Sequence, residues 1–334
     1  MRLKKYNRCL FCKSSKLRLN SKQGFVHNFY TKAIQNDFNL KDSFFLKMKV
    51  YKCTKCKIIQ NNPWFHYDDA FKIFNQIYGQ HNRNWSNILN FFKKGKKPDH
   101  GNLFAILKKN LKIKNYAEFN SPFMGIMINF FSEEYKNNNL NFLKKIFDIS
   151  LKYLTSRQLA GSNKTQKFNK TKLAKKYFNI LKKLKFQKFK NNEIQKTLIV
   201  DNSYLSWLYN DNYKSVNSKT LASALFDITV KNIEQNDTKI RYDLFGIFHT
   251  LDHTHQPKQI LDYALKSSKY VLIYCHVDEE LEKQHLFSLT SGFMNYLKEK
   301  KVKVFDLTSL INKDYKSPEQ YFLCSQKNQL PSFK

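Results

Sequence analysis

The sequence is poor in glycine and proline, with only 8 glycines and 6 prolines among 334 residues. Linkers between domains are commonly rich in these residues, and no such low-complexity segment marks a sharp boundary here. No period of about 20 to 50 residues recurs, which argues against a solenoid or a propeller. The length suits about two domains, and we expect them to follow one another without a marked linker.

Long hydrophobic runs are also absent. No segment approaches the roughly 18 uninterrupted apolar residues of a membrane span. The first fifteen residues, MRLKKYNRCLFCKSS, contain no apolar run like that of a signal peptide. These absences predict a cytoplasmic protein without a membrane partner, whose cysteines remain reduced.

Acidic residues are scarce, since 26 Asp and Glu face 59 Lys and Arg, for a net charge of +33. A basic surface can bind nucleic acid by releasing counterions. However, Lys, Asn, Phe, Ile and Tyr, whose codons are rich in A and T, are all abundant, and an AT-rich genome accounts for the excess. Residues 156–190 are a concentrated basic block without an acid, but apolar residues at helical spacing predict an amphipathic helix with a solvated lysine face. Nucleic acid is therefore a disfavoured partner.

Four of the six cysteines form two C-x-x-C pairs, Cys9 with Cys12 and Cys53 with Cys56. Thiolates at this spacing can converge from two turns on a tetrahedral zinc ion. The gap between the pairs exceeds the usual 15 to 20 or so residues, so a loop or hairpin must be inserted. A disulfide framework needs an oxidising compartment, and a thioredoxin-type site needs only one pair. We predict a small structural zinc-binding module with four cysteine ligands over residues 1–66.

Three further residues of types that can bind metal, one histidine and two cysteines, are interpreted as structural. His66 follows the second pair and is expected to be a surface or interface histidine, because four thiolates already complete the shell. Cys275 and Cys324 lie within apolar, strand-like runs. Both are predicted to be buried small hydrophobes.

The rest of the chain alternates between helical and strand patterns. Residues 67–115 are predicted to form a helical connector, in YDDAFKIFNQIYGQH and GNLFAILKKNL. Residues 116–334 are predicted to form a Rossmann-like domain with a Lys-rich helical insertion at about 138–196. Its first strand is expected at residue 116, within NYAEFNSPFMGIMINFF, followed by a tight loop and a helix. Further strands are expected in TLIVDNS, ALFDITV, YDLFGIF and KYVLIYCHV, with the helix PKQILDYALKSS between the last two.

This alternation predicts an α/β fold, a mostly parallel sheet with helices on both faces. At its end, the segment HLFSLTSGFMNYLKEKK is predicted to be one helix beginning at His285. The strands VKVFDLT and QYFLCSQ follow without a long helix between them, which predicts a closing antiparallel pair.

Together these features resemble S-adenosylmethionine (SAM)-dependent C-methyltransferases, in which a zinc-binding module precedes a class I, Rossmann-like domain. The resemblance rests on the C-x-x-C pairs followed by YDDAFKIFNQIYG, on RYDLFGIFHTLDHTHQPKQILDYAL, which is similar to the fourth methyltransferase strand and its helix, and on the helix-strand-strand ending. It implies an enzyme that methylates a small molecule such as a sugar.

The resemblance also implies where the cofactor binds, across the carboxyl ends of the first strands. The family's first loop has an acidic residue followed by several glycines. In AEFNSPFMG the implied cofactor residues are Glu118, Asn120 and Gly125, with Asn120 among residues that replace glycines. Asp201, after the second strand, would accept hydrogen bonds from the ribose hydroxyls; a helix cap or turn is its other interpretation. LIVDNSYLSW could alternatively be the first strand and loop.

The segment IFHTLDHTHQP follows the fourth strand and is rich in histidine. The family's C-methylating members use a histidine of this loop as general base, which places His253 in that role, and histidine titrates near neutral pH. Asp252 could hold a neighbouring imidazole. His249, four residues earlier, could share a face with His253 if the loop turns helically, and would face the cofactor. His276 ends the next strand at the same edge.

Other interpretations of these residues remain. His255 and His285 are expected to be structural, with His285 on the following helix. His249, His253 and His276 could instead bind a transition metal. The rivals to an enzyme are a zinc-containing protein that binds nucleic acid, and a non-catalytic partner of another enzyme.

Overall fold

The computed structural model describes most of both ends of the chain and little of its middle. It describes residues 1–20, 28–73, 100–119, 125–127, 129–130, 133, 176, 179–180, 194–200, 229–235, 242–277, 280–311, 319–326 and 329–333. The predicted Lys-rich insertion at 138–196 therefore lies almost entirely outside the described residues, as does the second half of the helix predicted at 67–81.

The N-terminal module is built on two small antiparallel sheets. Strand β1 (Leu3–Lys4) pairs with β5 (Trp64–Phe65), and a four-stranded sheet has the order β11-β4-β3-β2. The members of the larger sheet are β2 (Leu17–Leu19), β3 (Lys49–Cys53), β4 (Ile59–Asn62) and β11 (Phe287–Ser288).

Two helices fill the long gap between the cysteine pairs, where the sequence predicted a loop or hairpin. They are α1 (Phe29–Phe38) and α2 (Asp42–Leu46). Helix α1 begins with a capping box, because the Asn28 side chain accepts from the Thr31 N–H and the Thr31 side chain accepts from the Asn28 N–H. Helix α3 (Tyr67–Ile73) leads out of the module.

The central sheet has seven strands in the order β12-β13-β10-β9-β6-β7-β8. Five consecutive strands, from β10 to β8, are parallel, and β13 is antiparallel to both of its neighbours. The predicted mostly parallel sheet and closing antiparallel pair are thus confirmed. The strands are β6 (Asn115–Phe119), β7 (Gln195–Val200), β8 (Thr229–Asn232), β9 (Tyr242–Phe248), β10 (Ser268–His276), β12 (Lys303–Asp306) and β13 (Glu319–Ser325).

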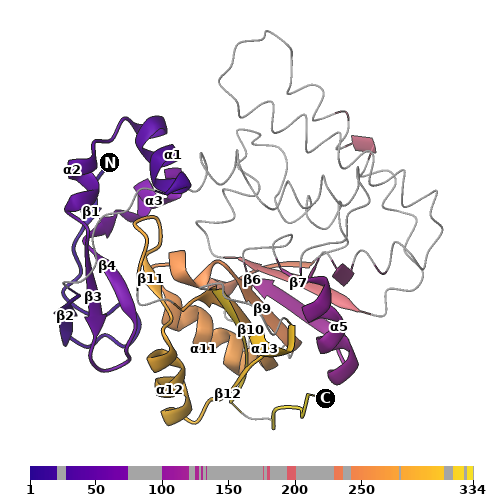
Figure 1. Ribbon diagram of the computed structural model, residues 1–334. Coiled ribbons are helices and arrows are strands. Elements are labelled where there is room, and N and C mark those ends of the chain that lie inside the picture. The colour runs from indigo at the N-terminus through magenta and orange to yellow at the C-terminus, as the bar shows by residue number, and fades with distance from the viewer. Residues whose placement is uncertain are drawn as a thin grey trace.

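Helices pack on the sheet and join it to the N-terminal module (Figure 1). Helix α11 (Pro257–Ser267) starts with proline at its first turn, and α12 (Ser291–Glu299) is capped by Thr290. One apolar core contains residues of the module, α11, α12 and one face of the sheet. For example, the Phe11 and Phe293 rings meet edge to face at 4.7 Å. Shorter elements are α5 (Gly101–Asn110), α13 (Thr308–Ile311), and the 3₁₀ turns η2 (Ile233–Gln235) and η3 (Leu251–His253).

The prediction that a helix begins at His285 is wrong. Phe287 and Ser288 form β11, which pairs with β4 of the module, and α12 begins only at Ser291. The Thr290 side chain accepts from the Phe293 N–H and so fixes the start of the helix. Residues 287–288, which precede the helix, pair with the edge of β4 as a strand. Helical periodicity alone did not indicate this pairing.

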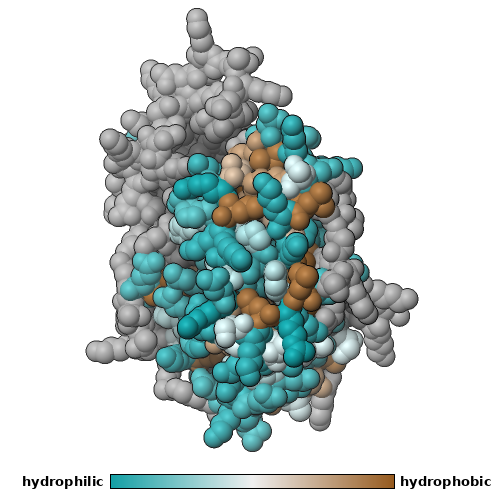
Figure 2. Space-filling view, turned by 90° about the vertical axis from the view of Figure 1, so that its left-hand side faces the viewer, coloured by the Kyte–Doolittle hydropathy of each residue, from teal (hydrophilic) through white to brown (hydrophobic). Residues whose placement is uncertain are grey.

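The face that the N-terminal module presents is mainly hydrophilic, with separate hydrophobic groups (Figure 2). Three of the large apolar side chains that are exposed among the described residues belong to the module, and a fourth, Tyr67, directly follows it. The exposed large apolar residues are Leu19, Phe29, Leu46, Tyr67 and Leu310.

In the part of the chain that the structure describes, no helix combines the length and the apolar character needed to cross a bilayer.

Candidate functional site

The four cysteines of the C-x-x-C pairs converge in the N-terminal module. The Sγ atoms of Cys9 and Cys56 lie 3.5 Å apart, and those of Cys12 and Cys53 lie 3.6 Å apart. Zinc–sulfur bonds of about 2.3 Å in a tetrahedron separate the sulfurs by about 3.8 Å, so this set fits a zinc ion. The hydrogen bond between Cys9 and Cys56 lowers the pKa of the Cys9 thiol to about 6 and raises that of Cys56, so in the metal-free pair Cys9 carries the thiolate. Four thiolates leave no open position, which suits a structural ion.

Both cysteine pairs lie on the same type of turn. Lys13 and Lys57 directly follow the pairs and adopt left-handed backbone conformations, with φ of 58° and 63°. In each turn the lysine N–H donates to the carbonyl of the first cysteine, at 3.0 Å for Cys9 and 2.9 Å for Cys53. The second turn also contacts α12, because the Thr290 hydroxyl donates to the Lys57 carbonyl at 2.8 Å. This geometry fixes the thiolates relative to the sheet.

His66 lies outside this shell, as predicted for a surface histidine. Its Nδ1 lies 3.2 Å from Asp68, and 36% of its side chain is exposed.

The central sheet reverses its strand order between β6 and β9. Counted along the chain, the parallel strands run 3-2-1-4-5 across the sheet, and ligands of doubly wound folds bind at the carboxyl ends of the strands where such an order reverses. Glu118 lies beside this point, opposite Gly246 of β9, and is fully buried. Its carboxyl group accepts hydrogen bonds from the Tyr116 hydroxyl and, at 3.1 Å, from the Met127 N–H. Glu118 therefore anchors the turn that follows β6.

Gly125, in that turn, approaches the sheet so closely that no side chain fits. A Cβ atom there would lie 2.3 Å from the Phe248 ring and 2.6 Å from the Glu118 carboxyl group. Glycine therefore lets this turn pack directly on the sheet, which is one of the uses of glycine in the first turn of doubly wound folds. Asn120 and Asp201, the other predicted cofactor residues, lie outside the described residues.

Burial raises the pKa of Glu118 to about 8, although hydrogen bonds from Tyr116 and Met127 act against that rise. Its Oε1 atom is buried without a hydrogen-bond partner. A protonated carboxyl group is the form that such an environment favours.

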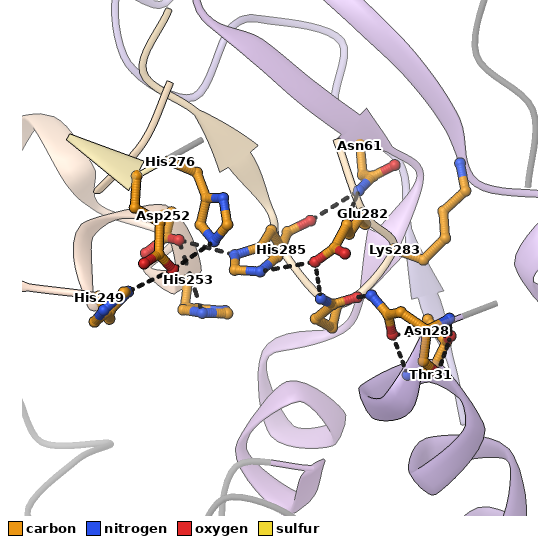
Figure 3. Close-up of polar contacts among 12 residues, drawn as sticks. Asn28, Thr31, Asn61, His249, Asp252, His253, His276, Glu282, Lys283 and His285 are labelled. Atoms are coloured by element: carbon orange, nitrogen blue, oxygen red, sulfur yellow. Dashed lines mark hydrogen bonds and ion pairs between the residues drawn. The ribbon is translucent and has the colours of Figure 1, made fainter. Parts of the chain in front are cut away.

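The loop after β9 brings Asp252 and His253 together with His285 (Figure 3). The 3₁₀ turn η3 buries the first two, and His285 Nδ1 lies 2.8 Å from Asp252 Oδ2. His253 Nε2 lies 3.9 Å from the same oxygen, and the two imidazole rings are 4.6 Å apart. His285 Nε2 faces Glu282 at 3.5 Å. The predicted role of Asp252 as a partner of an imidazole thus has its geometric counterpart, with His285 as the nearer ring.

The three ionisable side chains of this cluster, Asp252, His253 and His285, differ in their protonation. Burial lowers the pKa of His253 to about 3, so its imidazole is neutral. Burial opposes the charge of His285 too, but hydrogen bonds to Asp252 and Glu282 outweigh it and raise the His285 pKa to about 9. Burial also opposes the charge of Asp252, whose pKa the neighbouring imidazoles nevertheless hold far below its usual range. A buried ion pair, His285 with Asp252, therefore lies beside a neutral imidazole.

His249 and His276 face a second carboxylate. His249 Nδ1 and His276 Nε2 lie 3.5 and 3.3 Å from Glu319 Oε1. Tyr274 also donates a hydrogen bond to Glu319. His249 has a left-handed backbone, with φ of 48°, and its side chain lies against Glu319, whereas that of His253 lies against Asp252. The two histidines therefore do not share one set of partners.

The N-terminal module holds the loop that carries His285. We define the His285 loop as residues 281–286. The Asn61 side chain donates to the carbonyls of Glu282 and His285 at 2.9 and 2.8 Å. Trp64 Nε1 donates to the Lys283 carbonyl at 2.9 Å, and Lys283 Nζ donates to the Met48 carbonyl at 2.6 Å.

His285 is the site residue that the sequence did not single out. It is 33 residues from Asp252 along the chain, and their contact depends on where the module holds the loop. No spacing pattern indicates that contact. His255, by contrast, packs among the rings of Tyr6, Trp64 and Tyr67 at 5.5 to 6.2 Å, as a structural histidine does. Cys275 and Cys324 are fully buried, as predicted.

Apart from the four-cysteine set, one group of the described residues has ligand atoms within 4.8 Å of one another, namely Asp252, His253 and His285. The alternative metal site predicted from His249, His253 and His276 is not this set. Both ring nitrogens of His285 face carboxylates, so ion pairing accounts for its position.

Comparison with known proteins gives a fold likeness only. No protein-family model matches the sequence, and no curated protein matches it. Among solved structures, the N-terminal domain of EvdMO1 with SAH bound is 11% identical, with a TM-score of 0.29, over 69% of this chain and 84% of that one. A structure described as an O-methyltransferase from Klebsiella pneumoniae is 10% identical, with a TM-score of 0.32, over 78% of this chain and 99% of that one. The 16S rRNA methylase ArmA is 11% identical, with a TM-score of 0.29, over 78% of this chain and 98% of that one. At such scores the activity of this chain has to be argued from its own residues.

Proposed function

We propose that this protein is a SAM-dependent methyltransferase that acts on a small molecule, with a sugar as the acceptor class that the sequence resemblance favours. The observation that carries the proposal is the arrangement of residues at the point where the strand order reverses, between β6 and β9. A turn with no room for a side chain lies on one side of that place, at Gly125, and a buried imidazole–carboxylate cluster lies on the other, at the end of β9. When bound, SAM supplies an electrophilic methyl group on its sulfonium.

On the cofactor side, the turn at Gly125 gives the backbone close access to the carboxyl ends of the strands. Glu118 holds this turn through the Met127 N–H and does not need to touch the ligand itself. Asn120 directly follows β6, and Asp201 directly follows β7. We assign Asn120 to the cofactor-binding loop and the Asp201 carboxylate to the ribose hydroxyls.

On the acceptor side, His253 serves as the general base. Its imidazole is neutral because it is buried, and a pKa of about 3 makes it a weak base, so it takes the proton as the acceptor atom bonds to the methyl group and becomes acidic. As His253 takes a proton from the acceptor, the Asp252 carboxylate, 3.9 Å away, stabilises the imidazolium that forms. His249 and His276 lie on the Glu319 side of the cluster and position the acceptor. Methyl transfer requires in-line alignment, so positioning contributes much of the rate.

In the module, Cys9, Cys12, Cys53 and Cys56 hold a structural zinc ion. Sulfur separations of 3.5 and 3.6 Å match a tetrahedral shell, and the thiolates leave no position for a substrate. The module then contributes to the reaction through the loop it holds.

Calorimetric titration of the zinc-loaded protein with SAM and S-adenosylhomocysteine tests the cofactor site. We expect saturable binding at one site, weakened at least tenfold by Asp201→Ala. Absence of binding up to about millimolar cofactor would overturn the proposal, since that limit corresponds to only about 4 kcal/mol of binding free energy.

Methyl transfer from labelled SAM to a panel of sugars and nucleotide sugars tests the acceptor side. His253→Ala should lower the turnover number by about 10²-fold or more, as loss of a general base does, while cofactor affinity stays unchanged. If His285→Gln alone removes activity and His253→Ala does not, the base is His285 and the assignment of His253 is wrong.

The net charge of +33 favours a second candidate, a nucleic-acid-binding protein. An RNA or DNA affinity that falls steeply with salt, together with no affinity for SAM, would support it. Neutralising lysines between residues 164 and 190 should then remove that affinity. Unchanged function after His253→Ala, with cofactor binding intact, would instead indicate a non-catalytic partner.

A further inference from the structure

We propose that Asn61 is a positioning residue through which the N-terminal zinc module holds His285 against Asp252. This inference rests on the proposed function, in which the Asp252 cluster handles the proton of the acceptor. Asn61 is more than 220 residues from His285 along the chain, yet its side chain donates to the His285 carbonyl at 2.8 Å.

Asn61 is the centre of a set of contacts between β4 and the His285 loop (Figure 3). Its side-chain amide donates to two loop carbonyls, those of Glu282 and His285. Its own N–H donates to the Leu286 carbonyl at 2.9 Å. One residue therefore holds both ends of the turn that presents the His285 ring.

The other side of the His285 loop is tied to the candidate active site. The Leu286 N–H donates to the Asp252 carbonyl at 2.9 Å, and the His285 ring contacts the Asp252 carboxylate at 2.8 Å. The loop is thus held between β4 and the end of β9. A displacement of about 1 Å on the module side would lengthen the contact with Asp252 beyond hydrogen-bonding distance.

The metal-binding turn and Asn61 lie on the same hairpin. Strand β3 ends at Cys53, and β4 begins at Ile59, three residues after Cys56. Strand β4 pairs with β3 on one side and with β11 on the other. A metal ion that fixes the turn therefore also fixes the strand from which Asn61 reaches the loop.

The ionisation of His285 reports on this arrangement. The groups that face its ring are Asp252, Glu282, His253 and His276. Burial opposes the charge of His285, but the two carboxylates raise its pKa to about 9. If the loop moves away from Asp252, the pKa must fall toward its ordinary value near 6.5.

The test is an NMR pH titration of the full chain with labelled histidine imidazoles, in which His285→Gln assigns the His285 signal. In Asn61→Leu, which keeps the size of the side chain and removes its donors, we expect the His285 pKa to fall from about 9 to about 7 or below. Should Asn61→Leu fail to fold, Trp64→Phe removes a single donor to the same loop, at the Lys283 carbonyl, and should lower the pKa by a smaller amount.

The matched control is Asn62→Leu, in the same strand. The Asn62 side chain bonds to the backbone of Tyr6, at 2.7 and 2.8 Å, within the module. This variant should destabilise the module and leave the His285 pKa unchanged. Equal pKa values in Asn61→Leu and the wild type, or an equal fall in Asn62→Leu, would overturn the inference.

Removal of the metal with a chelator gives a second readout. We expect the His285 pKa in the metal-free protein to fall as it does in Asn61→Leu, and an unchanged pKa would contradict a role for the metal-binding turn. The titrations contain neither SAM nor an acceptor. Their failure is therefore distinguishable from failure of the proposed methyl transfer, which the calorimetric titration decides.

Discussion

At the scale of single residues, the two cysteine turns carry lysine where the backbone favours glycine. Lys57 has a φ of 63°, and a left-handed conformation costs an L-residue roughly 1–2 kcal/mol. Glycine avoids this cost but loses about 0.5–1 kcal/mol through its freedom in the unfolded chain. We therefore expect Lys57→Gly to raise the free energy of unfolding by about 0.5 kcal/mol, measured by urea denaturation of the zinc-loaded protein.

Lys52, in β3 of the same hairpin, provides the control for that substitution. Its backbone is extended, so Lys52→Gly should destabilise by about 0.5–1 kcal/mol. If both substitutions destabilise the protein alike, strain at Lys57 is not the reason.

Glu118 gives a prediction about pH. Burial raises its pKa to about 8 in the folded protein, whereas a carboxyl group in the unfolded chain titrates near 4.3. A raised acid pKa stabilises the fold at low pH, and this contribution is lost as the pH rises from about 4.3 to about 8. The free energy of unfolding of the wild type, relative to Glu118→Gln, should therefore fall by on the order of 3 kcal/mol between about pH 5 and pH 8.

Urea denaturation at both pH values measures that difference, because the comparison with the variant removes the contribution of other groups such as His285. A difference that stays constant with pH would mean that Glu118 is ionised throughout this range.

At this scale the sequence could indicate residue types but not all of their partners. Asp252 and His253 are adjacent in the chain, and the motif around them pointed to the end of β9. His285 reaches Asp252 only because β4 holds its loop, and a contact between two distant loops leaves no periodic pattern in the sequence. The prediction that His285 lies on a helix failed for that reason.

At the scale of elements, the turn after β6 should tolerate no side chain. The Cβ of Gly125→Ala would lie 2.3 Å from the Phe248 ring and 2.6 Å from the Glu118 carboxyl group. Because both neighbours are buried, we expect a loss of about 1–3 kcal/mol in the free energy of unfolding, with at least a tenfold loss of SAM affinity. Thermal unfolding and calorimetry measure the two effects.

Gly101, at the start of α5, serves as the matched control. A Cβ there meets nothing within 4 Å, and alanine is a better helix former than glycine. Gly101→Ala should leave SAM binding unchanged and add up to about 1 kcal/mol of stability. A Gly125→Ala protein that binds SAM normally would show that the turn does not form the cofactor site.

Elements differed in how well the sequence revealed them. Strands such as β9 and β10 lie in the middle of the sheet, and their apolar runs gave nearly their observed bounds. Strand β11 has two residues, which is too short for a pattern, and it exists because an edge of the module is available to it. Helices α1 and α2 likewise escaped prediction, since polar residues interrupt their short apolar faces.

At the scale of the whole molecule, the two ends of the chain form one packed structure. The module's sheet is completed by β11, from residues 287–288, and its core continues into α11 and α12. Loss of the metal should therefore affect the α/β layer as well as the module. The sequence indicated the order of the two parts but not this shared core, because the contacts that form it join residues hundreds of positions apart.

The net charge of +33 gives the last prediction. Like charges repel one another across the folded protein, and salt screens this repulsion, since the Debye length falls from about 30 Å at 0.01 M to about 8 Å at 0.15 M. Salt also weakens ion pairs such as Arg2 with Asp69, but 59% of the Arg2 side chain is exposed, and exposed pairs contribute little. The repulsion should dominate, so we expect the free energy of unfolding to rise by on the order of 1 kcal/mol over that salt range. Urea denaturation in NaCl and in NaF at equal ionic strength measures this effect and separates screening from binding of chloride, the counterion that a basic surface attracts. A fall in stability with salt would mean that local ion pairs outweigh the repulsion among the excess positive charges. Binding of a polyanion would then not stabilise the fold by relieving that repulsion.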